Sequence, residues 1–220
     1  MEAVRLNNHA VGLLRRKNVR GAARIFRNAF VDFGIWAANP PPGAGADDGL
    51  PDIGALSLGE MAVKIHPDLE EAFVALSPNN EFACYPCAFT LPERGLDPEK
   101  ISLVILYNLA LANHCLGIQT ATHETLRKAL RLFKKAQSLA VFAGHGHTSG
   151  VELVSLATWM NLGFLLSHFL LHREAHECSE QMISFMRSNR EALSTEDWIF
   201  FFVPNFLMKE VGLLKTAPSA

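Results

Sequence analysis

The chain has 220 residues, of which 49% are hydrophobic, and a formal net charge of −2 at pH 7. A chain of this length and apolar content can bury one substantial core without a second domain. The charge argues against a dedicated nucleic-acid binder. There is no run of about 18 uninterrupted apolar residues, so no membrane-spanning helix is predicted.

The four cysteines indicate a reducing environment. Cys84, Cys87, Cys115 and Cys178 show no disulfide framework, and two of them fall on predicted helix faces. The N-terminus leads directly into a predicted helix without an apolar signal segment. We therefore expect an intracellular protein, located in the cytoplasm, with the nucleus as the alternative.

The first predicted element is a helical hairpin at residues 2–35, whose second helix carries the pattern Ala22-x3-Phe26-x2-Ala29. This hairpin is basic: as far as residue 27, a single acidic residue, Glu2, stands against Arg5, Arg15, Arg16, Lys17, Arg20, Arg24 and Arg27. We interpret these charges as a solvated outer face. The alternative, a patch for nucleic acid or an acidic partner, is disfavoured because aromatic residues do not alternate with the charges.

Residues 39–56 are predicted to form a flexible loop because proline, glycine and aspartate dominate them. A β insertion is predicted to follow at residues 58–92. The period-two alternation from Met61 to His66 predicts one strand, and the aromatic-rich run from Phe82 to Leu91 predicts a second. Between them, the residues from Pro67 onward predict a short helix.

The second predicted strand contains the sequence Cys84-Tyr85-Pro86-Cys87, which resembles the redox motif of thioredoxin. That chemistry needs a helix N-terminus to lower the pKa of the first thiol, but strand-like residues follow here. A zinc site would need a second ligand pair, and the other two cysteines stand singly. Ordinary buried cysteines are therefore the favoured interpretation, with a redox or metal role as the alternative.

Two further helical hairpins are predicted at residues 96–143 and 150–189. The last one contains His168, His172 and His176, which would share one face of a continuous helix. A turn predicted near His168 would separate the three rings, so solvated histidines are favoured over a metal site. A C-terminal helix at residues 194–214 is predicted to cap the helical array, and it offers a surface for homo-oligomerisation.

The hairpins share an internal pattern. Ala129-x3-Phe133-x2-Ala136 repeats the spacing found in the first hairpin, and Trp159-Met160-Asn161-Leu162-Gly163 is similar to the first-helix signature of tetratricopeptide repeats (TPR). The chain thus resembles a TPR protein over about two thirds of its length. The separation from the asparagine of the first helix to the start of the pattern in the second helix is 14, 21 and 17 residues in the three hairpins. This predicts longer turns in the later two.

This resemblance implies a mainly α fold, in which TPR-like hairpins stack in a short right-handed solenoid with a small inserted β-hairpin. It also implies a non-enzymatic scaffold that binds a peptide or helix of another protein, without cofactor, metal, nucleic acid or membrane. Asn8, Asn108 and Asn161 fall at the position that faces the concave surface of TPR proteins and holds a peptide backbone. Tyr107 and Phe164 would add contact area.

Two alternatives stay open. Each asparagine amide could instead bond the backbone of a neighbouring hairpin and serve the fold alone. The chain could also be a metal-, redox- or pH-responsive module that uses Cys84 and Cys87, or His168, His172 and His176.

Overall fold

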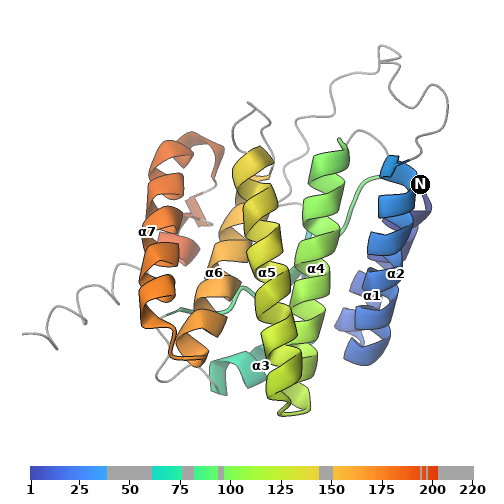
Figure 1. The fold of residues 1–220 in the computed structure, drawn as a ribbon, viewed down its shortest axis with the longest axis horizontal. Helices are drawn as coiled ribbons and strands as arrows, with labels where there is room; N and C mark the ends of the chain where they lie inside the picture. Colours follow the sequence, from blue (N-terminus) through green and yellow to red (C-terminus); the bar gives the residue numbers. More distant parts are fainter. Residues whose placement is uncertain are drawn as a thin grey trace, which may run out of the picture.

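The computed structural model describes residues 1–38, 61–75, 82–93, 97–143, 151–193, 195–196 and 198–202. These residues form a mainly helical protein with seven α-helices and one two-stranded antiparallel sheet (Figure 1). The helices are α1 (Glu2–Arg15), α2 (Val19–Ala38), α3 (Pro67–Ala75), α4 (Pro98–Gln119), α5 (His123–Ala143), α6 (Glu152–His168) and α7 (His172–Ser188). The predicted helical class and the small β insertion are both confirmed.

Six of the helices pair into three hairpins, α1–α2, α4–α5 and α6–α7. Figure 1 shows them side by side, with α7 at one end and α1 and α2 at the other. The second helix of each hairpin packs against the first helix of the next, so α2 lies on α4 and α5 lies on α6. Helices α4 and α6 are therefore buried almost all round, whereas α5 and α7 keep a polar face.

Helix α4 is long and apolar enough to cross a membrane by length and composition, but 83% of its most apolar window is buried inside the fold. A core helix meets the same criteria. Its start follows the sequence directly, because Asp97 is the N-cap and accepts the Lys100 N–H at 2.8 Å, and Pro98 occupies the first turn.

The three hairpins turn in the same way. In each turn one residue adopts a positive φ, at Lys17 (62°), Ala121 (49°) and Leu170 (58°). The N–H of the following residue then bonds back to the first helix, as Asn18 does to Leu13 at 2.9 Å and Leu171 does to Leu166 at 2.9 Å. The prediction of longer turns in the later hairpins is wrong, because the extra residues lie within the helices.

The β insertion consists of β1 (Ala62–Lys64), α3 and β2 (Cys87–Phe89). The two strands are antiparallel, with Val63 opposite Ala88. Residues 195–196 and 198–202 are helical, as predicted for the start of the C-terminal helix. The predicted loop at 39–56 and the rest of the C-terminal helix lie outside the described residues.

Candidate functional site

An extended segment, residues 85–91, runs across the first helices of all three hairpins. In a strand, alternate residues direct their backbone groups to opposite edges. The even-numbered residues face β1: the Pro86 carbonyl accepts the Ile65 N–H at 3.0 Å, and the Thr90 N–H donates to the Met61 carbonyl at 3.0 Å. One edge of the segment is therefore paired as in an ordinary sheet.

The other edge of the segment is paired by asparagine side chains from the helices. Asn8 on α1 accepts the Leu91 N–H at 2.7 Å and donates to the Leu91 carbonyl at 2.7 Å. Asn108 on α4 does the same for Phe89, at 2.9 and 2.7 Å. Asn8 and Asn108 thus bind the same segment in the same way, and the third predicted asparagine, Asn161, does so too.

Asn161 on α6 accepts the Tyr85 N–H at 2.7 Å and donates to the Tyr85 carbonyl at 3.2 Å. A primary amide offers one acceptor and a two-proton donor, so it can pair with both backbone groups of one residue. The three side chains occupy the place that a third strand would take in a wider sheet. We call this arrangement the amide-lined groove.

Two further residues complete the pairing. The Tyr107 hydroxyl donates to the Cys87 carbonyl at 2.9 Å and accepts from Asn161 at 3.1 Å. Asn7 donates to the Phe89 carbonyl at 3.1 Å and accepts from Asn108 at 2.9 Å. Sequence reasoning missed Asn7, and the only signal for it was its position beside Asn8.

The groove is buried as well as filled. Asn7, Asn108, Asn161 and Tyr107 are all 0% exposed, and only Asn8 is partly accessible. Burial raises the pKa of Tyr107 well above its usual value, so its hydroxyl stays protonated as a donor. Buried amides are costly unless their partners are in place, and here every amide has them.

Aromatic side chains pack around the segment. A Cβ on Gly163 would lie 2.3 Å from the Phe82 ring, so the absence of a side chain on α6 lets that ring approach. On the C-terminal side, the Phe201 ring stacks 5.3 Å from Tyr85. Phe164, predicted as contact area for a partner, is 1% exposed and its ring lies 5.3 Å from His114.

The surroundings of the cysteines disfavour the thiolate form. The Cys84 thiol retains some exposed surface and donates to Asn161 Oδ1 at 3.0 Å, but burial raises its pKa. Burial also raises the pKa of Cys115 and Cys178 to about 12. Cys87 lies in the strand β2, so these thiols are not at a helix N-terminus that would favour the reactive thiolate form. This geometry disfavours the redox alternative.

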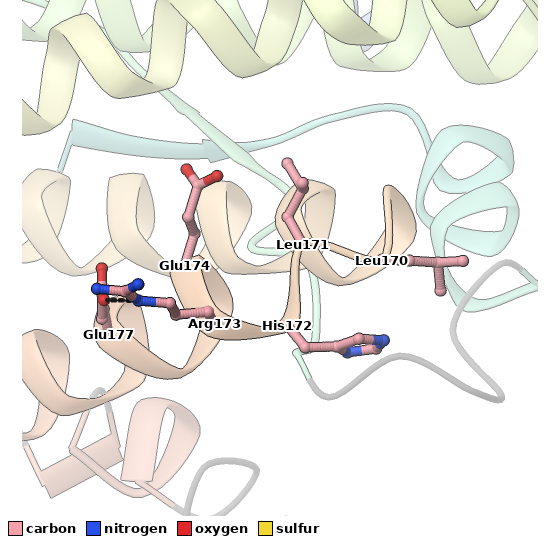
Figure 2. Close-up of a pocket in the computed structure, with 6 residues that line it drawn as sticks. All are labelled: Leu170, Leu171, His172, Arg173, Glu174 and Glu177. Atoms are coloured by element: carbon pink, nitrogen blue, oxygen red, sulfur yellow. Dashed lines mark hydrogen bonds and ion pairs between the residues drawn. The ribbon is translucent and has the colours of Figure 1, made fainter.

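The three predicted histidines are divided between two helices, since His168 ends α6 while His172 and His176 lie on α7. No group of three or more metal-ligating side chains gathers within the described residues. An open hollow of about 540 Å³ lies at this turn, and Figure 2 shows that the side chains lining it diverge. Among the lining residues, Arg173 and Glu177 pair with each other at 3.0 Å, and Glu174 pairs with Lys134 of α5.

Neither a protein-family model, nor a curated protein, nor a solved structure matches this chain. The amide-lined groove, which contains the three predicted asparagines, is the candidate site.

Proposed function

We propose that the chain is a non-enzymatic, TPR-like scaffold, with its hairpins stacked as a right-handed solenoid, which binds an extended segment of a partner protein in the amide-lined groove. One observation carries this proposal: Asn8, Asn108 and Asn161, at equivalent positions, each bracket the backbone of one residue of an extended segment. Such contacts recognise the main chain, so a partner segment can make the same bonds. Tyr107 adds a further donor, and Phe164 belongs to the apolar surroundings.

Residues 85–91 are the resident occupant, so a partner has to exchange with them. The exchange costs less than simple removal, because the incoming backbone restores the bonds to the amides and to β1. The resident segment competes at an effective concentration on the order of millimolar or higher. A partner at micromolar concentration therefore needs an advantage of about a thousandfold from its side chains.

Hydrogen exchange tests whether the groove opens. The amide protons of Tyr85, Phe89 and Leu91 are donated to the three asparagines. If the segment leaves the groove, these protons should exchange through an opening with a lower free energy than global unfolding. Exchange of all three only at the global value would mean that the groove stays filled and that a partner uses another surface.

A binding measurement gives the direct test. The probe is a fluorescein-labelled synthetic peptide with the sequence of residues 82–92, added to the intact chain. We expect saturable binding with a midpoint on the order of millimolar, because this peptide has no side-chain advantage over the resident segment. Binding should be tighter to Leu91→Pro, which removes the resident N–H that Asn8 accepts and leaves the groove amides in place. The control is Gln119→Ala, since Gln119 is exposed at the end of α4. Equal binding by both variants would contradict the proposal.

The proposal includes no cofactor and no metal, and it places the scaffold in the cytoplasm. The four cysteines are thiols and not disulfides, which supports a reducing compartment. Homo-oligomerisation through the C-terminal helix stays a prediction, because most of that helix lies outside the described residues.

A further inference from the structure

A second groove, of about 520 Å³, lies between α2 and α5 beside α4. Its walls are basic: Arg20, Arg24 and Arg27 come from α2, and Lys128 comes from α5. Between them lie two partly buried apolar side chains, Ala23 and Leu116. We call this hollow the basic groove. The arginines belong to the first hairpin, whose charges were interpreted from the sequence as a solvated face. Lys128 lines the opposite side of the groove, and the sequence did not connect it to the arginines.

Within the described residues, the cations of the basic groove have no acidic partner. No carboxylate from this part of the chain lines the groove or forms an ion pair with its four basic residues. Some other cations on the helix surfaces are paired, such as Lys17 with Asp68, Lys134 with Glu174 and Arg173 with Glu177. A concave surface with uncompensated charge of one sign attracts the opposite sign, even on a protein whose net charge is −2.

The spacing of the arginines suits an extended acidic chain. With a rise of about 1.5 Å per residue, Arg20 and Arg24 lie about 6 Å apart along α2, and Arg24 and Arg27 about 4.5 Å apart. Alternate side chains on one side of an extended peptide are about 6.6 Å apart. Glutamates at every second position can therefore reach successive arginines, whose planar guanidinium groups bind carboxylates through two hydrogen bonds.

We infer that the basic groove binds an acidic, extended segment of a partner protein, with carboxylates at alternate residues and small apolar side chains over Ala23 and Leu116. A nucleic acid fits less well, because none of the described residues that line the groove is aromatic and could stack on bases. This surface is separate from the amide-lined groove and does not depend on the function proposed for it.

The test uses the full chain and a fluorescein-labelled peptide of four Glu-Ala repeats, with fluorescence anisotropy at low salt. We expect the peptide to bind, the matching Gln-Ala peptide not to bind, and the affinity to fall as salt is raised. Arg24→Glu should weaken binding by about tenfold or more, because it replaces an attraction by a repulsion. Arg24→Gln should give a smaller loss in the same direction.

The matched control is Arg187→Glu. Arg187 is also an exposed arginine on a helix, but it lies on α7, in the hairpin at the other end of the molecule (Figure 1). It changes the net charge by the same amount, and we expect less than about a twofold loss of affinity. Thermal melting of all variants checks that the fold is kept.

Three results would overturn the inference. The first is equal loss by the two glutamate variants, which would reduce the effect to net charge. The second is tighter binding of a thymidine octanucleotide than of the Glu-Ala peptide, with sensitivity to Arg24→Glu, which would make nucleic acid the ligand. The third is the absence of any difference between the Glu-Ala and Gln-Ala peptides.

Discussion

The amide-lined groove and the basic groove are two polar surfaces with opposite relations to their own chain. In the first, Asn108 and Asn161 are fully buried, and residues 85–91 satisfy their hydrogen bonds. In the second, Arg20, Arg24 and Arg27 are exposed and no described carboxylate pairs with them. A polar residue that its own chain satisfies stabilises the fold first, whereas one that the chain leaves unpaired is available to a partner at once.

The difference has an energetic consequence. Buried hydrogen bonds contribute little more than about 1 kcal/mol each when made, but leaving a buried partner unpaired costs about 1–3 kcal/mol. Exposed charges contribute about 0–1 kcal/mol even when they are paired. Substitutions in the amide-lined groove should therefore change the free energy of unfolding, and substitutions in the basic groove should change binding alone.

The largest expected effect is that of Asn108→Ala. It leaves the buried Phe89 N–H without an acceptor and removes the donor to Asn7, so we expect a loss of about 3–5 kcal/mol in the free energy of unfolding. Asn8→Ala removes the same kind of bracket around Leu91 at a partly exposed site, where water can replace it, and should cost about 1–2 kcal/mol.

Urea denaturation of both variants measures the two losses. Equal losses at Asn108 and Asn8 would show that burial does not decide the cost. The comparison between satisfied and unsatisfied polar groups would then lose its physical basis.

The second prediction concerns the ring of Phe82, three residues before the extended segment. Gly163→Ala would place a Cβ 2.3 Å from Phe82, and the resulting displacement should cost about 1–3 kcal/mol. Gly12→Ala on α1 is the matched control, because no heavy atom lies within 4 Å of its added Cβ. Removal of that glycine should stabilise the helix by about 0.5–1 kcal/mol. Thermal melts with shifts of the same sign would contradict this assignment.

The local architecture was predictable from the sequence. The Asp97 cap, the three- and four-residue apolar spacing and the period-two run from Met61 are local signals, and each gave the element that is present. The shared position of the three asparagines was also visible. Gly163, the glycine of the Trp159-Met160-Asn161-Leu162-Gly163 motif, was visible as well, and its packing partner in the fold is Phe82.

The partners of these residues were not predictable. Asn8 bonds a residue 83 positions away and Asn161 one 76 positions away, and no local periodicity carries such a pairing. The occupant of the groove therefore had to come from the fold. The prediction of longer turns was wrong for a related reason, because the number of residues between two motifs does not tell helix from turn. All three turns close through the same backbone bonds. Lys128 and Arg20 line the same groove only because α2 and α5 both pack on α4, and the sequence did not show that packing.

The third prediction concerns His114, a buried polar residue that fits neither side of the comparison. Both of its ring nitrogens lack a hydrogen-bond partner among the described residues, and its ring lies 4.7 Å from Phe73 and 6.2 Å from Phe133. Burial, assisted by nearby His168, lowers its pKa from 6.5 to about 3. The folded state therefore keeps a neutral ring at pH values where the unfolded state binds a proton.

The sign of the pH effect follows from linkage. Because the folded pKa is depressed, stability is intact above pH 6.5 and falls as the pH is lowered toward 3. Between pH 7 and pH 5 this residue should cost about 2 kcal/mol. His114→Leu, which has a similar volume and no titrating group, should remove that part of the pH dependence in urea denaturation at the two pH values. The same slope in both proteins would show that His114 is accessible to protons when folded.

The smallest expected effect is the change in the free energy of unfolding caused by Arg24→Gln in the exposed basic groove. Arg24 lies four residues after Arg20 and three before Arg27 on one face of α2, and like charges at these spacings repel each other by about 0.2–0.5 kcal/mol per pair. Glutamine has a similar helix propensity, so the variant should unfold at the same free energy or be more stable by a few tenths of a kcal/mol. Added salt should narrow the difference, because it screens the repulsion in the wild type. Urea denaturation at low and high salt measures both quantities. A loss of more than about 1 kcal/mol would mean that Arg24 is held by the fold, in the way that Asn108 is, and the basic groove would then not be a surface left free for a partner.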